Sequence, residues 1–354
     1  MNKETKAQEK EVRVRQPLTA RRVGDLLLNN ALIIIMVIAV IYIAIRNPNF
    51  IKPASLINIF SQTAAYLPAA LGIGGCIVLT GTDLSAGRAV GLTACISASL
   101  LQNAANTANK MWPEIGTLPI PVVILLAMLI GAAIGCFNGL FVAKFKLHPF
   151  IVTLGTQLIL YTCLLLYVQQ GNNNGMAISN LDPSYTSFVK GELFRINGTP
   201  VPMYVLFAVV LTAVMWFIWN KTTFGKNMFA VGSNEEAANV SGVNVTATII
   251  LVFVLAGVMY AVTGFFDGAR IASVNANTGL NYECDAIAAC VIGGVSFVGG
   301  IGKISGIVVG VLLLQIIFTG LNFLSVDQNA LYIIKGLVIL VACAIDMRKY
   351  LVRK

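Results

Sequence analysis

Residues 120–143 read IPVVILLAMLIGAAIGCFNGLFVA, and this stretch holds no charged side chain. About 20 apolar residues in a helix are enough to cross the hydrocarbon core of a bilayer. Gly131, Gly135 and Gly139 recur at every fourth position, a spacing that lets neighbouring membrane helices approach closely. The stretch therefore predicts a helix that spans a membrane and packs within a bundle.

The rest of the chain has the same character. Of its 354 residues, 57% are hydrophobic and 11% are charged, whereas a soluble domain carries about 25% charged residues. The apolar residues suffice for about ten spans and leave little for a soluble domain. This composition excludes a large cytosolic enzyme, a disordered chain and a nucleic-acid-binding protein. We predict an all-α fold, a polytopic membrane helical bundle with about ten transmembrane helices.

The candidate spans are apolar runs separated by more polar segments. They lie at about 27–45, 58–80, 89–105, 120–143, 149–169, 201–219, 249–266, 284–301, 304–321 and 330–346. Residues 1–26 are expected to form an N-terminal tail, residues 27–346 the membrane domain, and residues 347–354 a C-terminal tail. Gly306 and Gly310 repeat the close-packing spacing in a later span.

Basic residues gather on one side of the membrane when the spans alternate in direction. That side receives both tails together with Lys144, Lys146, Lys221, Lys226 and Lys303. Loops rich in lysine and arginine stay in the cytoplasm, so both termini are predicted to be cytoplasmic. The bias is imperfect, because the opposite side receives Arg46, Lys52, Lys110, Lys190, Arg195 and Arg270.

The sequence contains no catalytic constellation. His148 is the one histidine and has no second imidazole or thiolate with which to bind a metal, so we expect a structural role. The seven cysteines are scattered and are expected to pack as small hydrophobic residues. Residues 299–305, GGIGKIS, fail as a phosphate-binding loop, because Phe297 and Ile304 stand where glycine and a hydroxyl residue are required. We predict a non-catalytic chain without metal or cofactor.

The loop 220–248 is the longest polar stretch between spans on the predicted cytoplasmic side. Its segment Ser233-Asn-Glu-Glu236 predicts a capping box, in which Ser233 accepts from the backbone N–H of Glu236 and Glu236 accepts from that of Ser233. Gly242 is a typical C-terminal stop. A helix of about two turns does not persist alone in water. The loop is therefore either a simple connection or a helix presented to a partner.

A family resemblance favours the presented helix. Glu236-Ala237-Ala238, followed after three residues by Gly242, resembles the EAA motif of permeases in ATP-binding-cassette (ABC) importers. Residues 224–245, FGKNMFAVGSNEEAANVSGVNV, resemble the ribose/galactose/xylose branch of these sugar permeases. So do GTDLSAGR at 81–88 and YECDAIAACVIGG at 282–294, although Cys284 stands where the branch has leucine. GTDLSAGR is most similar to galactose-type members.

The resemblance implies a fold, partners and a site. The fold is that of a type II-like importer permease in the bacterial inner membrane, a homodimer surrounded by lipid whose interface forms the path. A separate ATPase subunit uses ATP and magnesium, and a periplasmic galactose/glucose-type binding protein delivers galactose, a methyl galactoside or a related monosaccharide. The residues implied to couple the chain to the ATPase are Ser233, Glu235, Glu236, Ala237, Ala238 and Gly242.

Asp83, Ser85 and Arg88 are candidates for the translocation path. A carboxylate at the edge of a membrane is costly, and an ion pair with Arg88 would lower that cost. Two roles for Asp83 stay open. It caps the following helix, or a broken helix brings it into the path.

Tyr282, Glu283 and Asp285 follow a loop rich in asparagine and are further candidates for the path. Polar groups beside an aromatic face suit a sugar, so the cluster is a candidate portal or docking rim. A solvated loop explains the same residues equally well. Tight binding would slow release in a path fed by a binding protein, so we expect a weakly polar path without one sharp site.

The alternative function is proton-coupled secondary transport through Asp83, Glu283 and Asp285, and a passive channel is a third possibility. The capped cytoplasmic loop argues against both. The carboxylates also fall near the ends of predicted spans rather than at mid-span, which argues further against proton coupling.

Overall fold

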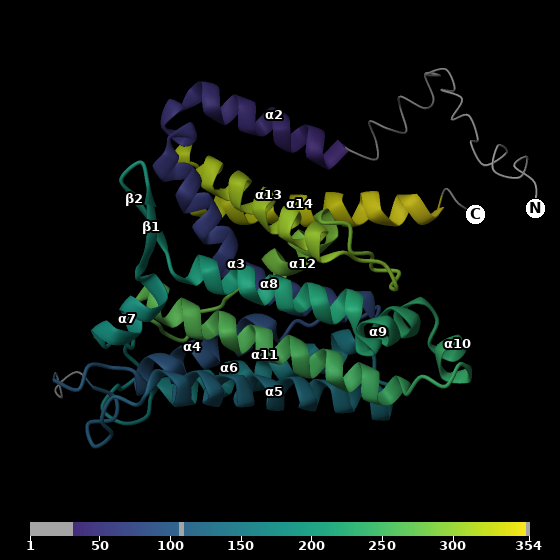
Figure 1. The fold of residues 1–354 in the computed structure, drawn as a ribbon, viewed down its shortest axis with the longest axis horizontal. Coiled ribbons are helices and arrows are strands. Elements are labelled where there is room, and N and C mark those ends of the chain that lie inside the picture. Colours follow the sequence, from purple (N-terminus) through teal and green to yellow (C-terminus); the bar gives the residue numbers. More distant parts are fainter. Residues whose placement is uncertain (1–30, 106–109, 352–354) are drawn as a thin grey trace, which may run out of the picture.

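The chain folds into a bundle of helices, most of which have their axes along the same line of the molecule (Figure 1). The computed structural model describes residues 31–105 and 110–351. The first half of the chain forms α2 (Ala31–Arg46), the short η1 (Pro48–Ile51), α3 (Pro53–Val78), α4 (Ala86–Leu100), α5 (Ile120–Phe145) and α6 (Pro149–Val168). The second half adds α7 (Pro183–Lys190), β1 (Glu192–Ile196), β2 (Thr199–Pro202), α8 (Tyr204–Lys221), α9 (Thr223–Ser233), α10 (Glu235–Val240), α11 (Val245–Ile271), α12 (Tyr282–Ile292), α13 (Ile304–Phe323) and α14 (Gln328–Leu351).

The predicted fold class is confirmed. Every predicted apolar run contains a helix, and within the described ranges six helices are long and apolar enough to cross a membrane: α3, α5, α6, α8, α11 and α13. Of the expected tails, residues 1–30 and 352–354 lie outside the described residues, and α14 continues through Leu351.

Close backbone contacts hold the long helices together. α11 lies against α3, α4 and α5. A Cβ atom at Gly135 of α5 would overlap the carbonyl oxygen of Phe253 on α11, and Gly131 and Gly257 meet in the same way. On α13, Gly306 faces the carbonyl oxygen of Gly293 directly after α12. The glycine spacing therefore marks helix–helix contacts, as predicted.

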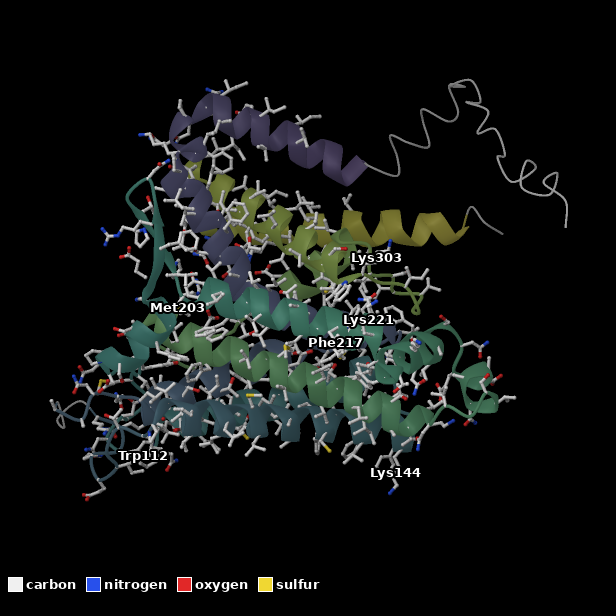
Figure 2. The ribbon with its side chains drawn as sticks, viewed as in Figure 1. Trp112, Lys144, Met203, Phe217, Lys221 and Lys303 are labelled. Carbon is white, nitrogen blue, oxygen red and sulfur yellow. The ribbon has the colours of Figure 1, made fainter. Side chains whose placement is uncertain are left out.

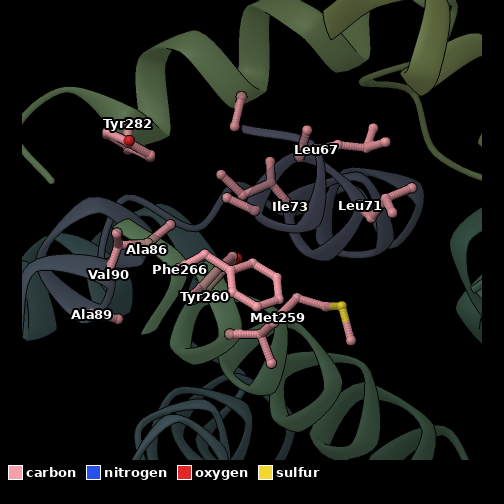
Figure 3. Close-up of a cluster of buried hydrophobic side chains, with 14 of the residues drawn as sticks. Leu67, Leu71, Ile73, Ala86, Ala89, Val90, Met259, Tyr260, Phe266 and Tyr282 are labelled. Carbon is pink, nitrogen blue, oxygen red and sulfur yellow. The ribbon is translucent and has the colours of Figure 1, made fainter. Parts of the chain in front are cut away.

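Two predicted spans are interrupted. α4 has 15 residues and α12 has 11, so the expected continuous span over 284–301 is wrong beyond Ile292. The ring of Tyr282, the first residue of α12, stacks on Tyr66 at 4.4 Å between centroids. Tyr66 lies near the midpoint of the 26-residue α3, so α12 begins about halfway through the bundle. Figure 3 shows Tyr282 at this start, beside side chains of α3 and α4.

The segment 272–281, which enters the bundle before α12, is not helical and consists largely of turns. Its backbone groups find other partners, as non-helical backbone at membrane depth requires. Val274 exchanges two hydrogen bonds with Ile178, at 2.7 and 3.0 Å. The Arg88 guanidinium donates to the carbonyl of Ala276 at 3.1 Å, and the Thr278 hydroxyl accepts from the backbone N–H of Asn275 at 3.0 Å. The Arg88 side chain, the backbone of Ile178 and the segment's own Thr278 thus supply partners that allow α12 to start about halfway through the bundle.

The two ends of the bundle differ. Lys144, Lys221 and Lys303 lie toward one end, with α9 and α10, whereas Trp112 and Met203 lie toward the other (Figures 1 and 2). This distribution confirms that the predicted basic loops share one end.

The expected external loop 170–200 contains α7 and part of a β-hairpin, which the sequence analysis missed. Asn197 and Gly198 have φ values of 49° and 81° between β1 and β2, and such Asn-Gly pairs are typical of tight hairpin turns. On β1, a hydrogen bond from the Arg195 guanidinium lowers the pKa of the Glu192 carboxyl.

The α5–α11 contact gives a direct test. Gly135→Val should lower the free energy of unfolding by about 1–3 kcal/mol or more, because the new side chain overlaps backbone atoms of α11. Gly155→Val is the matched control, since a Cβ atom at Gly155 on α6 meets nothing within 4 Å. Thermal melting of the purified chain in detergent would measure both. Equal melting temperatures would contradict the packing.

Candidate functional site

The α9–α10 corner, residues 222–244, carries the predicted coupling residues. Asn234 has extended backbone (φ −163°, ψ 109°), and its side-chain oxygen accepts from the backbone N–H of Ala237 at 2.8 Å. Ser233 is still helical as the last residue of α9, and its hydroxyl donates to the carbonyl of Phe229 at 2.8 Å. The predicted capping box of Ser233 and Glu236 is therefore wrong, and Asn234 is the cap.

The predicted stop at Gly242 is confirmed. Gly242 has φ 84° and donates to the carbonyl of Asn239, while Val243 donates to that of Ala238, both at 3.0 Å. This pair of hydrogen bonds is the glycine-terminated Schellman motif.

The short α10 presents mostly exposed side chains. Ala238 is buried against the corner, whereas Glu235, Glu236 and Ala237 are exposed and Val240 is 90% exposed. A groove of about 430 Å³ lies between α10 and the end of α5, with Glu235, Glu236 and Lys146 on its walls. The corner thus offers both acidic and apolar groups at the basic end of the bundle.

A junction of glycines connects this corner to the membrane helices. We call Gly232, Gly299, Gly300 and Val78 the glycine junction. Gly232 of α9 has no room for a Cβ atom, because its backbone lies against the carbonyl oxygen of Val78, the last residue of α3. Gly300, in the loop after α12, donates to that same carbonyl at 2.9 Å. The segment that failed as a phosphate loop is therefore a packing element.

Asp83 lies in the turn between α3 and α4 and is 1% exposed. One carboxylate oxygen accepts from both the backbone N–H (2.9 Å) and the hydroxyl (2.6 Å) of Ser85, the residue before α4. Asn138 of α5 donates to the Ser85 hydroxyl at 2.9 Å, and Thr156 of α6 donates to Asn138 at 2.6 Å. This buried chain holds the turn against two helices, which favours the structural role of Asp83.

Arg88 does not pair with Asp83, so that expectation is wrong. As the third residue of α4, Arg88 faces α6 and the segment before α12 instead. Its guanidinium lies 4.2 Å from the ring centre of Tyr161 and donates to Ala276.

Tyr282, Glu283 and Asp285 are buried, at 7%, 5% and 6% exposure, so a solvated loop is wrong for them. The Tyr282 hydroxyl donates to Asp267 of α11 and also lies 3.3 Å from the guanidinium of Arg270. Arg270 in turn bonds to Asp267 at 2.7 Å and to Gln62 of α3 at 2.8 Å. Three helices thus meet in one charge-balanced cluster.

Asp285 has a separate partner. Its carboxylate accepts from the ammonium of Lys335 on α14 at 2.7 Å, and both groups line a cavity of about 490 Å³ with Tyr66. Glu283 packs against Gly87 at the start of α4. The two carboxylates therefore face different surroundings although they lie two residues apart.

The sequence analysis missed Gln62, Tyr66, Asp267, Arg270 and Lys335. Asp267 and Arg270 did carry a signal, because opposite charges at a three-residue spacing within an apolar run face one another on a helix. His148 caps α6, its ring nitrogen Nδ1 accepting from Phe150 N–H at 3.3 Å, in line with the expected structural role. Within the described parts of the chain, no three Cys, His, Asp or Glu side chains gather at a metal site.

The chain is similar to known membrane permeases. Residues 55–343 match the family described as "Branched-chain amino acid transport system / permease component". The chain belongs to this family. The permease is a non-catalytic membrane component with several spans.

Curated relatives match the permease over almost its whole length. The galactose/methyl galactoside import permease protein MglC of Haemophilus influenzae is 43% identical over 330 residues, covering 93% of this chain and 97% of that protein. MglC of Escherichia coli is 44% identical over 322 residues, covering 91% and 94%. The ribose import permease protein RbsC of Haemophilus influenzae is 33% identical over 325 residues, covering 92% and 95%. No solved structure matches the chain.

One argument against proton coupling is wrong. Glu283 and Asp285 were expected near a span end, but they lie at the mid-height start of α12. Membership of the permease family, rather than the depth of these carboxylates, separates the permease from a secondary transporter.

The structural role of Asp83 can be tested in the permease. Asp83→Asn should keep stability and transport, because an amide oxygen accepts the same two bonds from Ser85. Asp83→Ala should lower the unfolding free energy by about 1–3 kcal/mol, because buried donors lose their acceptor. Thermal melting and sugar uptake are the measurements.

Asp182 provides the matched control, since it makes the same pair of bonds with Ser184 at an exposed site. Asp182→Ala should lower the free energy of unfolding by less than Asp83→Ala does, because water replaces the lost acceptor at the exposed site. Loss of uptake in Asp83→Asn at unchanged stability would place Asp83 in a proton or substrate path instead.

Proposed function

We propose that this permease is the membrane subunit of an ABC importer that moves galactose or a methyl galactoside across the inner membrane. The observation that carries the proposal is the difference in identity: 40–44% to galactose/methyl galactoside permeases and 33–34% to ribose permeases, each over most of the chain. A separate ATPase subunit hydrolyses ATP with magnesium. Two copies of the permease form the path.

The basic end of the bundle is the cytoplasmic end. Lys144, Lys221 and Lys303 lie there, and lysine-rich loops stay in the cytoplasm. Both termini are on this side. The exposed Glu235, Glu236 and Val240 of α10 dock on the ATPase, with charge at the rim and an apolar residue at the tip.

The glycine junction gives this docking a mechanical consequence. α9 touches the end of α3 and the loop after α12 through backbone atoms at Gly232, Val78 and Gly300. No flexible side chain lies between them to absorb a displacement. A movement of α9 therefore reaches α3 and α12, which carry Tyr66 and Asp285 deeper in the bundle.

The opposite end of the bundle receives the sugar. It carries α7 and the β1–β2 hairpin, which protrude beyond the helices (Figure 1). A periplasmic galactose/glucose-type binding protein docks at this end and releases the sugar to the path.

Reconstitution tests the proposed function. The permease and its ATPase in proteoliposomes should hydrolyse ATP faster when a galactose-loaded binding protein is added, because docking at one end is transmitted to the other. Uptake of radioactive galactose should accompany hydrolysis. Sugar-free binding protein is the control. Uptake that needs no ATPase and collapses with a proton uncoupler would overturn the proposal in favour of secondary transport.

Two variants test the coupling route. Glu236→Ala should weaken docking by about 1 kcal/mol, or fivefold, because it removes an exposed charge of α10. Gly232→Val should lower stimulated ATP hydrolysis more strongly, because its side chain separates α9 from Val78. Glu114→Ala and Gly155→Val make the same chemical changes at exposed positions away from the corner. Unchanged stimulation in both test variants at normal membrane levels would contradict the route.

A further inference from the structure

The cavity of about 490 Å³ lies between α3, α12, α13 and α14. Its volume falls in the range of small-molecule sites, about 300–1,000 Å³. We propose that this cavity binds one neutral monosaccharide within each permease chain, as a weak transit site. The inference rests on the proposed function and adds the residues that hold the sugar on its way.

Two rows of polar side chains line the cavity. Asn58, Gln62 and Tyr66 follow one another by four residues on α3, so they share one face of that helix. On α13, Thr319 and Asn322 follow Gln315 by four and seven residues and also share a face. The two rows run antiparallel, so that the first residue of the α3 row, Asn58, and the last of the α13 row, Asn322, lie at the same end of the cavity.

The rows lead from an open mouth to a buried floor. Asn58 and Asn322 are exposed, whereas Gln315 and Thr319 are 7% and 8% exposed. The mouth lies toward the proposed periplasmic end, because the neighbouring Phe323 carbonyl accepts from Asn47, directly before η1, at 3.1 Å. A sugar released at that end therefore meets the cavity first at its amides.

The floor of the cavity has no net charge. The Asp285 carboxylate and the Lys335 ammonium lie 2.7 Å apart and neutralise each other. A charged sugar acid or an inorganic ion would have to compete with this pair at a partly buried site, which is costly. The floor therefore favours a neutral ligand that both accepts and donates hydrogen bonds.

Sugar hydroxyls suit the groups that remain. Each hydroxyl both donates and accepts, as do the amides of Asn58, Gln315 and Asn322. Over the residues that the structure describes, no protein group hydrogen-bonds to the side chain of Gln315, although it is buried. The amide of Gln315 lines the cavity, so a ligand hydroxyl there would find both a donor and an acceptor.

Aromatic rings supply the apolar contacts that sugar C–H groups need. Tyr66, Phe318 and Tyr332 line the cavity with the polar rows. Tyr66 is held in place by its stack on Tyr282, which bonds to Asp267 and Arg270. Polar and apolar groups on several helices thus surround the same space.

Saturation-transfer NMR of the purified full-length permease in lipid nanodiscs tests the site, with methyl β-galactoside at millimolar concentration as the probe. We expect magnetisation transfer to the ring protons of methyl β-galactoside, and we expect added galactose to reduce this transfer by competition. Gln315→Leu should reduce the transfer at least fivefold, since it removes the buried amide. Thr319→Val, which keeps the shape and removes one hydroxyl, should reduce it less. Gln169→Leu makes the same change as Gln315→Leu on an exposed residue at the end of α6 and should leave the transfer unchanged.

Three results would overturn the proposal: no transfer to the wild type, equal transfer in the wild type and both cavity variants, or equal transfer to glucuronate. Gel filtration establishes that each variant is folded. If Gln315→Leu does not fold, Thr319→Val still decides the test. The ATPase assay above separates the two proposals. Stimulated hydrolysis without saturation transfer overturns the transit site alone, whereas absence of both overturns the importer function as well.

Discussion

The need to pair every backbone N–H and C=O group inside a bilayer governs this structure. α12 begins halfway through the bundle, and the segment 272–281 that leads to it is not helical. That arrangement is possible only because Arg88, Thr278 and Ile178 bond to its backbone. The interruption places Tyr282 and Asp285 in the interior, where an unbroken span would present different residues at that depth.

Backbone contacts at glycine link the two regions that carry function. At Gly232 the α9–α10 corner touches the end of α3 and Gly300 in the loop after α12, and Gly293, directly after α12, touches Gly306 of α13. The cavity lies between these same helices. The corner and the cavity are therefore parts of one packed unit, connected by contacts that close-packed interiors transmit rather than absorb.

The sequence predicted what depends on local composition. Each apolar run contains a helix, and most of these helices are long, because hydrophobicity over about 20 residues suffices to define a span. It did not predict where α12 starts, since that depends on contacts with residues as distant as Arg88 and Ile178. The sequence predicted Ser233 as the cap of α10, whereas Asn234 is the cap in the structure. Both side chains can cap a helix, and the backbone conformation of the corner selects between them. Asp285 and Lys335 lie 50 residues apart, so no local pattern joins them.

The ion pair of Asp285 and Lys335 also bears on the energetics of the membrane potential. Moving one elementary charge across a potential of 100 mV involves about 2.3 kcal/mol. A neutral sugar that passes a charge-compensated floor carries no net charge through the field. The potential then neither drives nor opposes the cargo, so in the proposed importer accumulation against a gradient depends on the ATPase subunit and not on the electrical state of the cell.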